Sequence, residues 1–385
     1  MKLQRNILES INELIDKYPV IAITGPRQSG KTTFLKNTFS EYEYVNLENL
    51  DQREFAQEDP NGFLKRYTGK TIIDEAQRVP TLFSYLQTKV DEENRMGHYI
   101  LSGSQNFHLM QNITQSLAGR VALFRLFPFD FQELKKEKLL DSDYLHCMLK
   151  GFYPAIYSRG IKSSKFYANY IETYVQRDLT ELLEIKNLAL FKKFFSLLAT
   201  RTAQLLNLNE LANECGISQP TAKSWVSLLE SSYIVFKLQP YHENFSKRLV
   251  KTPKIYFYDT GLLCHLLGIN NYDYLLANSI KGALFENMMI SEHVKSMYHK
   301  NQVVDNWFWR DSAGNEIDLV YSENKQLITH EIKSSATILN KHMKGLNYFE
   351  KKAENRTVIK KMIYTGNEHY VRQNCEMIPW HEFTF

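Results

Sequence analysis

The chain has 385 residues, of which 43% are hydrophobic and 23% are charged, and its formal net charge is +4. This length predicts two or three domains, and the composition is typical of a soluble globular protein. The mild positive charge permits contact with nucleic acid without requiring it. No apolar run approaches the length of a membrane span and the N-terminus has no apolar signal core, so we expect no membrane partner.

The four cysteines lie far apart in the sequence, and none of them forms a C-x-x-C pair. We interpret them as reduced thiols in a reducing compartment, and we therefore expect a cytoplasmic protein. They are Cys147, Cys215, Cys264 and Cys375.

The N-terminal region predicts a helix followed by a strand–loop–helix unit. Residues 7–17 carry apolar side chains at helical spacing, which predicts an amphipathic helix. Residues 18–36 then show an apolar run typical of a buried strand, a loop with two glycines, and a second helical stretch. This strand–loop–helix unit is the stretch around which the remaining sequence is organised.

Its loop fits the P-loop pattern G-x-x-x-x-G-K-[ST]. Gly25 and Gly30 let the backbone turn tightly and approach phosphate oxygens, and the N–H groups of the loop and helix start form an anion cradle. Lys31 would reach the β- and γ-phosphates of ATP, and the hydroxyl of Thr32 would ligate Mg²⁺. The residues that we expect to contact the nucleotide are Gly25, Pro26, Arg27, Gln28, Ser29, Gly30, Lys31, Thr32 and Thr33.

The next informative stretch is a strand that ends in two acids. Residues 43–47 and 71–73 predict strands, and residues 51–67 between them have helical spacing. In P-loop NTPases acids at this place form the Walker B motif, in which Asp74 would hold Mg²⁺ and Glu75 would polarise the attacking water. Two acids after a strand are also typical of a solvated strand end. Their place downstream of a P-loop favours the catalytic interpretation.

A further strand signal, over residues 98–106, again leads from apolar into polar residues. Ser104 or Gln105 there can contact the γ-phosphate or the lytic water, and the alternative is a plain turn with serine as a helix N-cap. Arg120 directly precedes a predicted strand at 121–126 and can stabilise γ-phosphate charge in its own or a neighbouring subunit. The alternative for Arg120 is a solvated or salt-bridged side chain.

Several segments together resemble an AAA+-type ATPase family that carries a C-terminal domain called DUF4143 and is related to archaeal and STAND-type ATPases. The segments that carry the resemblance are residues 25–33, 72–77, 101–104, 117–120, 127–134, 151–154 and 174–179. The resemblance implies an α/β ATPase core with a parallel sheet, ATP as ligand and Mg²⁺ as cofactor. It covers nearly the whole chain, and its motifs specify the architecture but not a biological role.

The middle of the chain predicts a helix-turn-helix. Residues 208–230 read as a helix, a turn at Gly216, and a second helix that Ser218 would cap. Strands at 233–238 and 254–258 would form the wing of a winged helix. If this module binds double-stranded DNA, mainly through phosphates, the candidate contacts are Gln219, Thr221, Lys223, Ser224, Lys247, Arg248 and Lys251. A winged helix used only for packing or protein contact is the alternative, because the second helix is poor in arginine and lysine.

The C-terminal third predicts a cluster of charged residues on neighbouring strands. Alternate residues of a strand share a face, so Asp318 points the same way as Glu316, and Glu331 the same way as Lys333. This layout resembles the PD-(D/E)XK nuclease fold. The resemblance implies Mg²⁺ bound by Asp318 and Glu331, a water positioned by Lys333, and Glu286 in the helix acid position of that family. No proline precedes Asp318, which departs from the family's usual pattern.

We therefore expect an α/β protein with four parts. They are a P-loop AAA+-type ATPase domain (1–140), a helical lid or connector (141–204), a winged-helix domain (205–258) and a PD-(D/E)XK nuclease-like domain (259–385). The predicted function is Mg·ATP hydrolysis coupled to metal-dependent DNA processing. The alternative is an ATP-driven binding switch whose inactive nuclease-like domain holds DNA or a protein, and an AAA+-type core also suggests a homo-oligomer.

Overall fold

The computed structural model describes residues 3–104, 109, 112–113, 115–174, 187–241, 250–353 and 356–383. Its contacts divide the chain into two compact units. Unit 1 comprises Met1–Glu137 with the short segments Ser231–Tyr233 and Lys295–Val303, and unit 2 comprises the remaining residues. No described helix combines the length and the apolar character that crossing a membrane would require.

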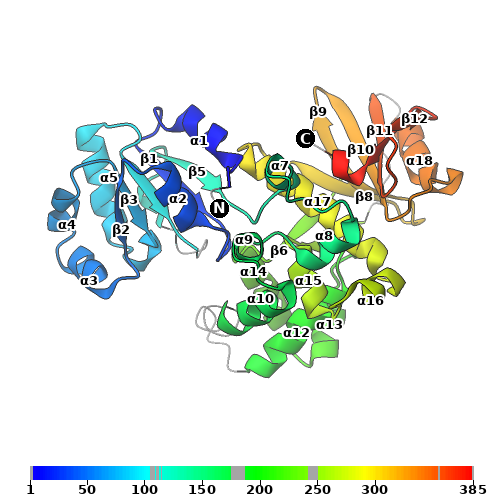
Figure 1. The fold of residues 1–385 in the computed structure, drawn as a ribbon, viewed down its shortest axis with the longest axis horizontal. Helices are drawn as coiled ribbons and strands as arrows, with labels where there is room; N and C mark the ends of the chain where they lie inside the picture. Colours follow the sequence, from blue (N-terminus) through cyan, green and yellow to red (C-terminus); the bar gives the residue numbers. More distant parts are fainter. Residues whose placement is uncertain are drawn as a thin grey trace. The chain divides into compact units, whose positions relative to one another are not determined.

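Unit 1 is an α/β domain built on a five-stranded sheet (Figure 1). Its strand order is β2-β3-β4-β1-β5, and every neighbouring pair is parallel, as expected. The elements are α1 (Ile7–Leu14), β1 (Val20–Thr24), α2 (Lys31–Thr38), β2 (Glu43–Asn46), α3 (Leu50–Glu58), α4 (Pro60–Arg66), β3 (Thr71–Asp74), η1 (Ala76–Arg78), α5 (Leu82–Glu93), β4 (Tyr99–Ser102), β5 (Val121–Arg125) and α7 (Phe131–Lys136).

Both faces of this sheet are covered, which explains why β1 is buried throughout and apolar up to its last residue, Thr24. Ile21 and Ile23 face a cluster that includes Phe34 and Leu35 of α2. Val20 and Ala22 face the opposite cluster, which α4 and α5 contribute to. Because all five strands are parallel, their carboxyl ends meet at one edge of the sheet, and the P-loop follows β1 at that edge.

Unit 2 joins a helical region to an eight-stranded mixed sheet of order β12-β13-β11-β10-β9-β8-β6-β7 (Figure 1). Its elements are α8 (Tyr144–Lys150), α9 (Pro154–Ser158), α10 (Ser163–Tyr170), α12 (Leu188–Thr200), α13 (Leu208–Cys215), α14 (Gln219–Ser231), β6 (Val235–Pro240), β7 (Lys254–Phe257), α15 (Thr260–Leu266), α16 (Tyr272–Ala277), α17 (Lys281–His299), β8 (Asn306–Arg310), β9 (Glu316–Glu323), β10 (Gln326–Lys333), η3 (Asn340–Met343), α18 (Lys344–Lys352), β11 (Val358–Tyr364), β12 (Tyr370–Arg372), β13 (Cys375–Pro379) and η4 (Trp380–Glu382). The last residues of α17 are counted with unit 1. One face of the sheet packs on α18 through Leu346 and Phe349.

The expected helix–turn–helix elements are present at the expected residues. Helix α13 ends at Gly216, whose φ of 81° lies in the left-handed region, and α14 begins at Gln219. The Ser218 hydroxyl accepts a hydrogen bond from the N–H of Thr221 at 3.2 Å, as an N-cap does. Strands β6 and β7 form the antiparallel pair expected of a wing.

That strand pair, however, also belongs to the larger sheet. Strand β6 pairs in parallel with β8, so β6 and β7 extend the sheet that carries the C-terminal strands. The domain boundary predicted between residues 258 and 259 would therefore separate β6 and β7 from the other strands of the same sheet. Alternating apolar residues predict a strand but not the strand that pairs with it, so the sequence pattern did not show this connection.

Candidate functional site

The loop between β1 and α2 has the backbone that a P-loop requires. Gly25 has a φ of 145°, and a Cβ there would lie 2.1 Å from the carbonyl oxygen of Leu126. Gly30 has a φ of 92° and directly precedes the first residue of α2. Only glycine combines these conformations with so close a neighbour. A glycine-containing loop that leads directly into the start of a helix is the local structure that suits an anion.

Lys31, the first residue of α2, is turned back onto this loop. Its Nζ donates hydrogen bonds to the carbonyl oxygens of Gly25 at 2.8 Å and Pro26 at 2.9 Å. Burial lowers the pKa of Lys31 to about 8, although the nearby Glu75 and Asp74 act in the opposite direction. The ammonium group is thus held beside the loop by neutral carbonyls, which a phosphate group can replace.

Asp74, at the end of β3, lies against Thr32 at the start of α2. The hydroxyl of Thr32 donates to Asp74 Oδ2 at 2.8 Å, and Tyr44 of β2 donates to the same oxygen at 2.7 Å. The Ser102 hydroxyl of β4 donates to Asp74 Oδ1. Carboxylate and hydroxyl oxygens are the ligands that Mg²⁺ prefers, so these residues fit the ion.

Glu75, the residue after Asp74, has its backbone in the left-handed region, with a φ of 55°. Its Oε2 accepts hydrogen bonds from Gln77 Nε2 at 2.5 Å and from the Ser104 hydroxyl at 3.1 Å. The structure therefore brings Ser104 to Glu75. Gln105 lies outside the described residues.

Three residues around these acids were not predicted to take part: Tyr44, Ser102 and Gln77. Ser102 ends β4 and Tyr44 is the second residue of β2, the two strands next to β3, and the sheet order decides that both meet Asp74. For Ser102 the position at a strand end was the available signal, but it does not identify the neighbouring strand. Ser29, in the loop itself, is fully buried, and its hydroxyl has no partner among the described residues. This orphaned hydroxyl is consistent with a ligand in the loop.

Arg120 lies at the opposite edge of the sheet. Its carbonyl accepts a hydrogen bond from the N–H of Val20, the first residue of β1, whereas the P-loop follows the last residue of that strand. The length of β1, about 16 Å at roughly 3.3 Å per residue, separates them. The guanidinium pairs with Asp91 at 2.8 Å. The structure thus does not bring Arg120 to the nucleotide site of its own chain, because β5 runs parallel to β1.

In unit 2 the structure brings Asp318, Glu331 and Lys333 together. Asp318 of β9 lies beside β10, and its Oδ2 accepts a hydrogen bond from the N–H of Ile332 at 2.8 Å. Lys333 Nζ lies 2.5 Å from Glu331 Oε1 and 3.6 Å from Asp318 Oδ2. Burial and the Asp318 charge raise the pKa of Glu331 to about 8, against the effect of Lys333. Glu331 Oε2 is buried and has no partner in the described part of the chain.

Glu286 of α17 is held in this region by two residues of β7 that the sequence did not indicate. Lys254 Nζ lies 2.9 Å from Glu286 Oε1, and the Tyr256 hydroxyl donates to the same oxygen at 2.7 Å. Lys254 also pairs with Glu316 of β9. Burial alone would lower the pKa of Lys254, but the charges around it, of which Glu286 is the strongest, together outweigh burial and hold the pKa well above its usual value.

The predicted metal ligands of unit 2 are not gathered around one point. Within the described residues, the group of three whose ligand atoms lie within 4.8 Å of one another is Asp130, Glu133 and His299, in unit 1. These three residues already contact one another and other groups of the protein. Asp130 Oδ2 lies 2.7 Å from His299 Nδ1, the Phe127 N–H donates to His299 Nε2 at 3.3 Å, and Arg5 Nε lies 2.9 Å from Glu133 Oε1. We interpret it as a structural cluster.

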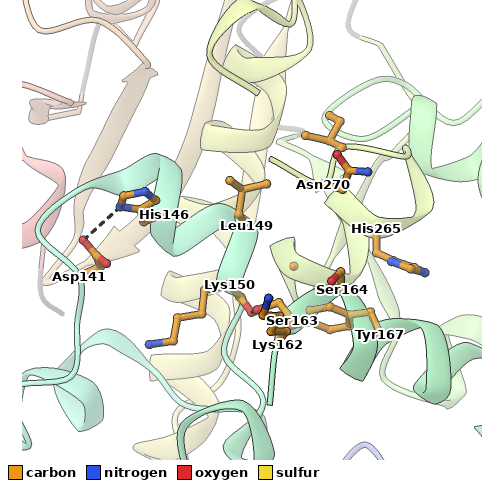
Figure 2. A pocket seen from close by; sticks show the side chains of 12 residues that line it. Asp141, His146, Leu149, Lys150, Lys162, Ser163, Ser164, Tyr167, His265 and Asn270 are labelled. Atoms are coloured by element: carbon orange, nitrogen blue, oxygen red, sulfur yellow. Dashed lines mark hydrogen bonds and ion pairs between the residues drawn. The ribbon is translucent and has the colours of Figure 1, made fainter. Parts of the chain in front are cut away.

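A pocket of about 450 Å³ opens in unit 2 between α8, α10 and α15 (Figure 2). Asp141 pairs with His146 at 3.8 Å on its rim, as the dashed line in Figure 2 marks. Lys150 Nζ lies 4.1 Å from the centre of the Tyr157 ring. Because the charged lining groups are partly or fully exposed, we assign no ligand to it.

Most of the predicted DNA contacts on α14 face solvent. Gln219, Lys223 and Ser224 are exposed, and Thr221 is half-buried beside Ser218. Lys251 is exposed as well. Lys247 and Arg248 lie outside the described residues.

Family comparisons match three parts of the chain. Residues 17–135 match a model described as an AAA domain, and residues 281–383 match a domain of unknown function, DUF4143. Residues 141–273 match a second domain of unknown function, DUF8612.

The sequence is 30% identical over 338 residues to the uncharacterized proteins Rv2008c of Mycobacterium tuberculosis and Mb2031c of Mycobacterium bovis, covering 87% of this chain and 74% of each relative. Among solved structures, the Walker-type ATPase PABY2304 of Pyrococcus abyssi aligns at a TM-score of 0.44 and 15% identity, covering 68% of this chain and 94% of that one. The RuvB Holliday junction branch migration motor of Thermotoga maritima aligns at 0.32 and 17% identity, covering 60% and 88%. The chain belongs to the family of AAA-type P-loop ATPases that carry a C-terminal DUF4143 domain.

Proposed function

We propose that this chain binds Mg·ATP in the loop from Gly25 to Thr33 and hydrolyses it. The observation that carries the proposal is the hydrogen bond of 2.8 Å between Thr32 and Asp74, which joins the P-loop helix to the acid-bearing strand. A hydroxyl and a carboxylate side by side at the end of an anion cradle form the donor set expected for a nucleotide-bound Mg²⁺.

Each residue has a distinct task in this proposal. The loop N–H groups bind phosphate oxygens, and Lys31 leaves the carbonyls of Gly25 and Pro26 to reach the β- and γ-phosphates. Thr32 and Asp74 hold Mg²⁺, which supplies charge neutralisation at the phosphates. Glu75, kept in place by Ser104 and Gln77, orients the attacking water and accepts its proton.

The test is to measure ATP binding and hydrolysis separately in two variants. Lys31→Ala should lose ATP binding, whereas Glu75→Gln should keep binding and lose about 10²–10⁴-fold in hydrolysis rate. Lys65→Ala, an exposed lysine on α4, is the matched control and should behave as the wild type. Normal ATP affinity in Lys31→Ala would show that the nucleotide binds elsewhere.

A second candidate function is metal-dependent DNA processing in unit 2, regulated by ATP. It is favoured by the side-by-side placement of Asp318, Glu331 and Lys333, and by the exposed polar face of α14. The rival is a switch that holds DNA or a protein without cutting it. Cleavage of duplex DNA with Mn²⁺ that is lost in Asp318→Asn supports processing, and binding without cleavage supports the switch.

DNA binding itself is tested with Lys223→Ala at several salt concentrations. If Lys223 contacts a phosphate, the variant should bind weaker for every sequence, and the slope of log affinity against log salt should fall by about one. An unchanged slope would remove α14 from the proposed interface.

We also propose a cytoplasmic location, because all four cysteines are buried and free. A homo-oligomer in which Arg120 serves the site of a neighbouring copy stays a prediction. Analytical ultracentrifugation with and without ATP tests it, and a monomer under both conditions would contradict it.

A further inference from the structure

Basic side chains of the protein itself neutralise the carboxylates of the predicted metal site in unit 2. Four acids meet there, namely Glu286, Glu316, Asp318 and Glu331. Each of them forms an ion pair with Lys254 or Lys333, and Arg310 lies 3.1 Å from Glu316 as well. The negative charge that would attract a divalent cation is therefore largely cancelled.

Lys254 is the unusual member of this set. Its side chain is 2% exposed, yet its amine carries a positive charge between Glu286 and Glu316. A lysine is rarely buried this deeply unless its charge is paired. The ammonium group lies on the Oε1 atom of Glu286, one of the oxygens that a metal ion would need.

We propose that Lys254 occupies the cation position next to Glu286, so that a divalent ion binds Glu286, Asp318 and Glu331 only when this ammonium group is displaced. This inference rests on the second candidate function, which places a metal ion in unit 2. It explains why these acids, with suitable chemistry, are not gathered around one point. It also accounts for Tyr256, which fixes Glu286 from the same strand. Glu331 Oε2, for which no described residue is a partner, is the oxygen left over in this arrangement.

The test measures Mn²⁺ binding by calorimetry and electron paramagnetic resonance, without nucleotide and in the Asp74→Asn background, which removes the P-loop site. Lys254→Met should bind Mn²⁺ at least about tenfold more tightly than the chain with Lys254, because a unit charge at ion-pair distance is removed. Lys254→Arg should stay as weak as Lys254. Adding Asp318→Asn to Lys254→Met should abolish the gained binding.

Two further variants keep the result interpretable. The double variant Lys254→Met with Glu316→Gln removes one positive and one negative charge together, and it should gain Mn²⁺ affinity even if the single variant fails to fold. Lys360→Met is the matched control, because Lys360 is a buried lysine of the same unit that pairs with Glu350 instead. It should gain nothing.

The possible failures are distinct. Equal Mn²⁺ affinity with and without Lys254, lost in Asp318→Asn, would keep the metal site and overturn the role of Lys254. Absence of Mn²⁺ binding in every variant would overturn the metal site and the Lys254 proposal with it, and ATP hydrolysis by unit 1 would be untouched by either result.

Discussion

The P-loop site and the C-terminal site both present buried acids, but the acids have different partners. Asp74 accepts hydrogen bonds from three hydroxyl groups, those of Thr32, Tyr44 and Ser102. Glu286 and Glu331 contact the ammonium groups of Lys254 and Lys333. Hydroxyl donors stabilise a carboxylate without cancelling its charge, whereas an ammonium group cancels it.

This difference separates a site prepared for an external cation from a site that is complete without one. A Mg²⁺ ion arriving at Asp74 displaces neutral donors, which can rotate and coordinate it as Thr32 does in the proposed mechanism. A cation arriving at Glu286 has to displace another cation from a buried position. We therefore expect the carboxylate of Asp74 in unit 1 to bind a divalent cation readily, and the carboxylate of Glu286 in unit 2 to resist one.

The largest effect that would test this comparison is at Asp74. Asp74→Asn keeps the size of the side chain but removes the charge, and we expect Mg²⁺-dependent ATP hydrolysis to fall about 10³-fold, because stabilisation by the metal ion is worth several kcal/mol. The measurement is phosphate release at saturating ATP over a Mg²⁺ series. Asp273→Asn, on an exposed position of α16, serves as the control. Hydrolysis at the wild-type rate in Asp74→Asn would mean that the hydroxyl-lined acid is no cation site.

The nucleotide site could be predicted from the sequence because its parts are local. Gly25, Gly30 and Lys31 lie within seven residues, and the backbone that they require depends on the glycines themselves. The Walker B acids were recognisable because they end an apolar strand. Ser104 was expected at a strand end to contact the γ-phosphate or the lytic water; its hydroxyl donates to Glu75, and the contact with phosphate or water stays a prediction.

What failed was whatever depended on pairing between distant strands. Arg120 precedes β5, and only the parallel pairing of β5 with β1 shows that this end lies away from the P-loop of its own chain. A role in a neighbouring copy stays a prediction. Lys254 and Tyr256 meet Glu286 only because β7 and α17 pack together across about 30 residues of sequence. No motif or period in the sequence encodes that contact.

The buried cluster of Asp130, Glu133 and His299 in unit 1 offers a third carboxylate for the comparison. There the guanidinium of Arg5 pairs with Glu133. Their side chains are 4% and 0% exposed. Removing the cation in Arg5→Met takes the guanidinium from a buried carboxylate and leaves it two backbone N–H donors and His299 Nδ1 at 3.9 Å. We expect unit 1 to lose about 3–5 kcal/mol of unfolding free energy. All four tryptophans lie in unit 2, so hydrogen exchange over β1 rather than tryptophan fluorescence is the appropriate measurement.

The control for Arg5 is Arg201→Met. Arg201 pairs with Glu210 and Glu214 in unit 2, but its side chain is 27% exposed. An exposed pair is worth about 0–1 kcal/mol, so its loss should be nearly neutral. Equal effects at the two arginines would show that burial does not decide what an ion pair contributes here.

The smallest predicted effect is at Tyr44, which tests the hydroxyl partners of Asp74 directly. Tyr44→Phe removes one donor to a buried carboxylate, and we expect unit 1 to lose about 1.5–3 kcal/mol in the absence of ligand. Saturating Mg·ATP should recover part of that loss, because the metal ion takes the place of the missing donor. The ligand should therefore stabilise Tyr44→Phe more than it stabilises the wild type.

The matched control is Tyr42→Phe, since Tyr42 donates to the carbonyl oxygen of Gly97 at 2.6 Å instead of to an acid. That change should cost about 1 kcal/mol, and Mg·ATP should not recover it, because Gly97 precedes β4 and so lies at the end of the parallel sheet away from the P-loop. The decisive quantity is the difference between the two variants in stabilisation by Mg·ATP. If this difference is zero, the hydroxyl groups around Asp74 are structural partners only, and the contrast between the two carboxylate sites loses its physical basis.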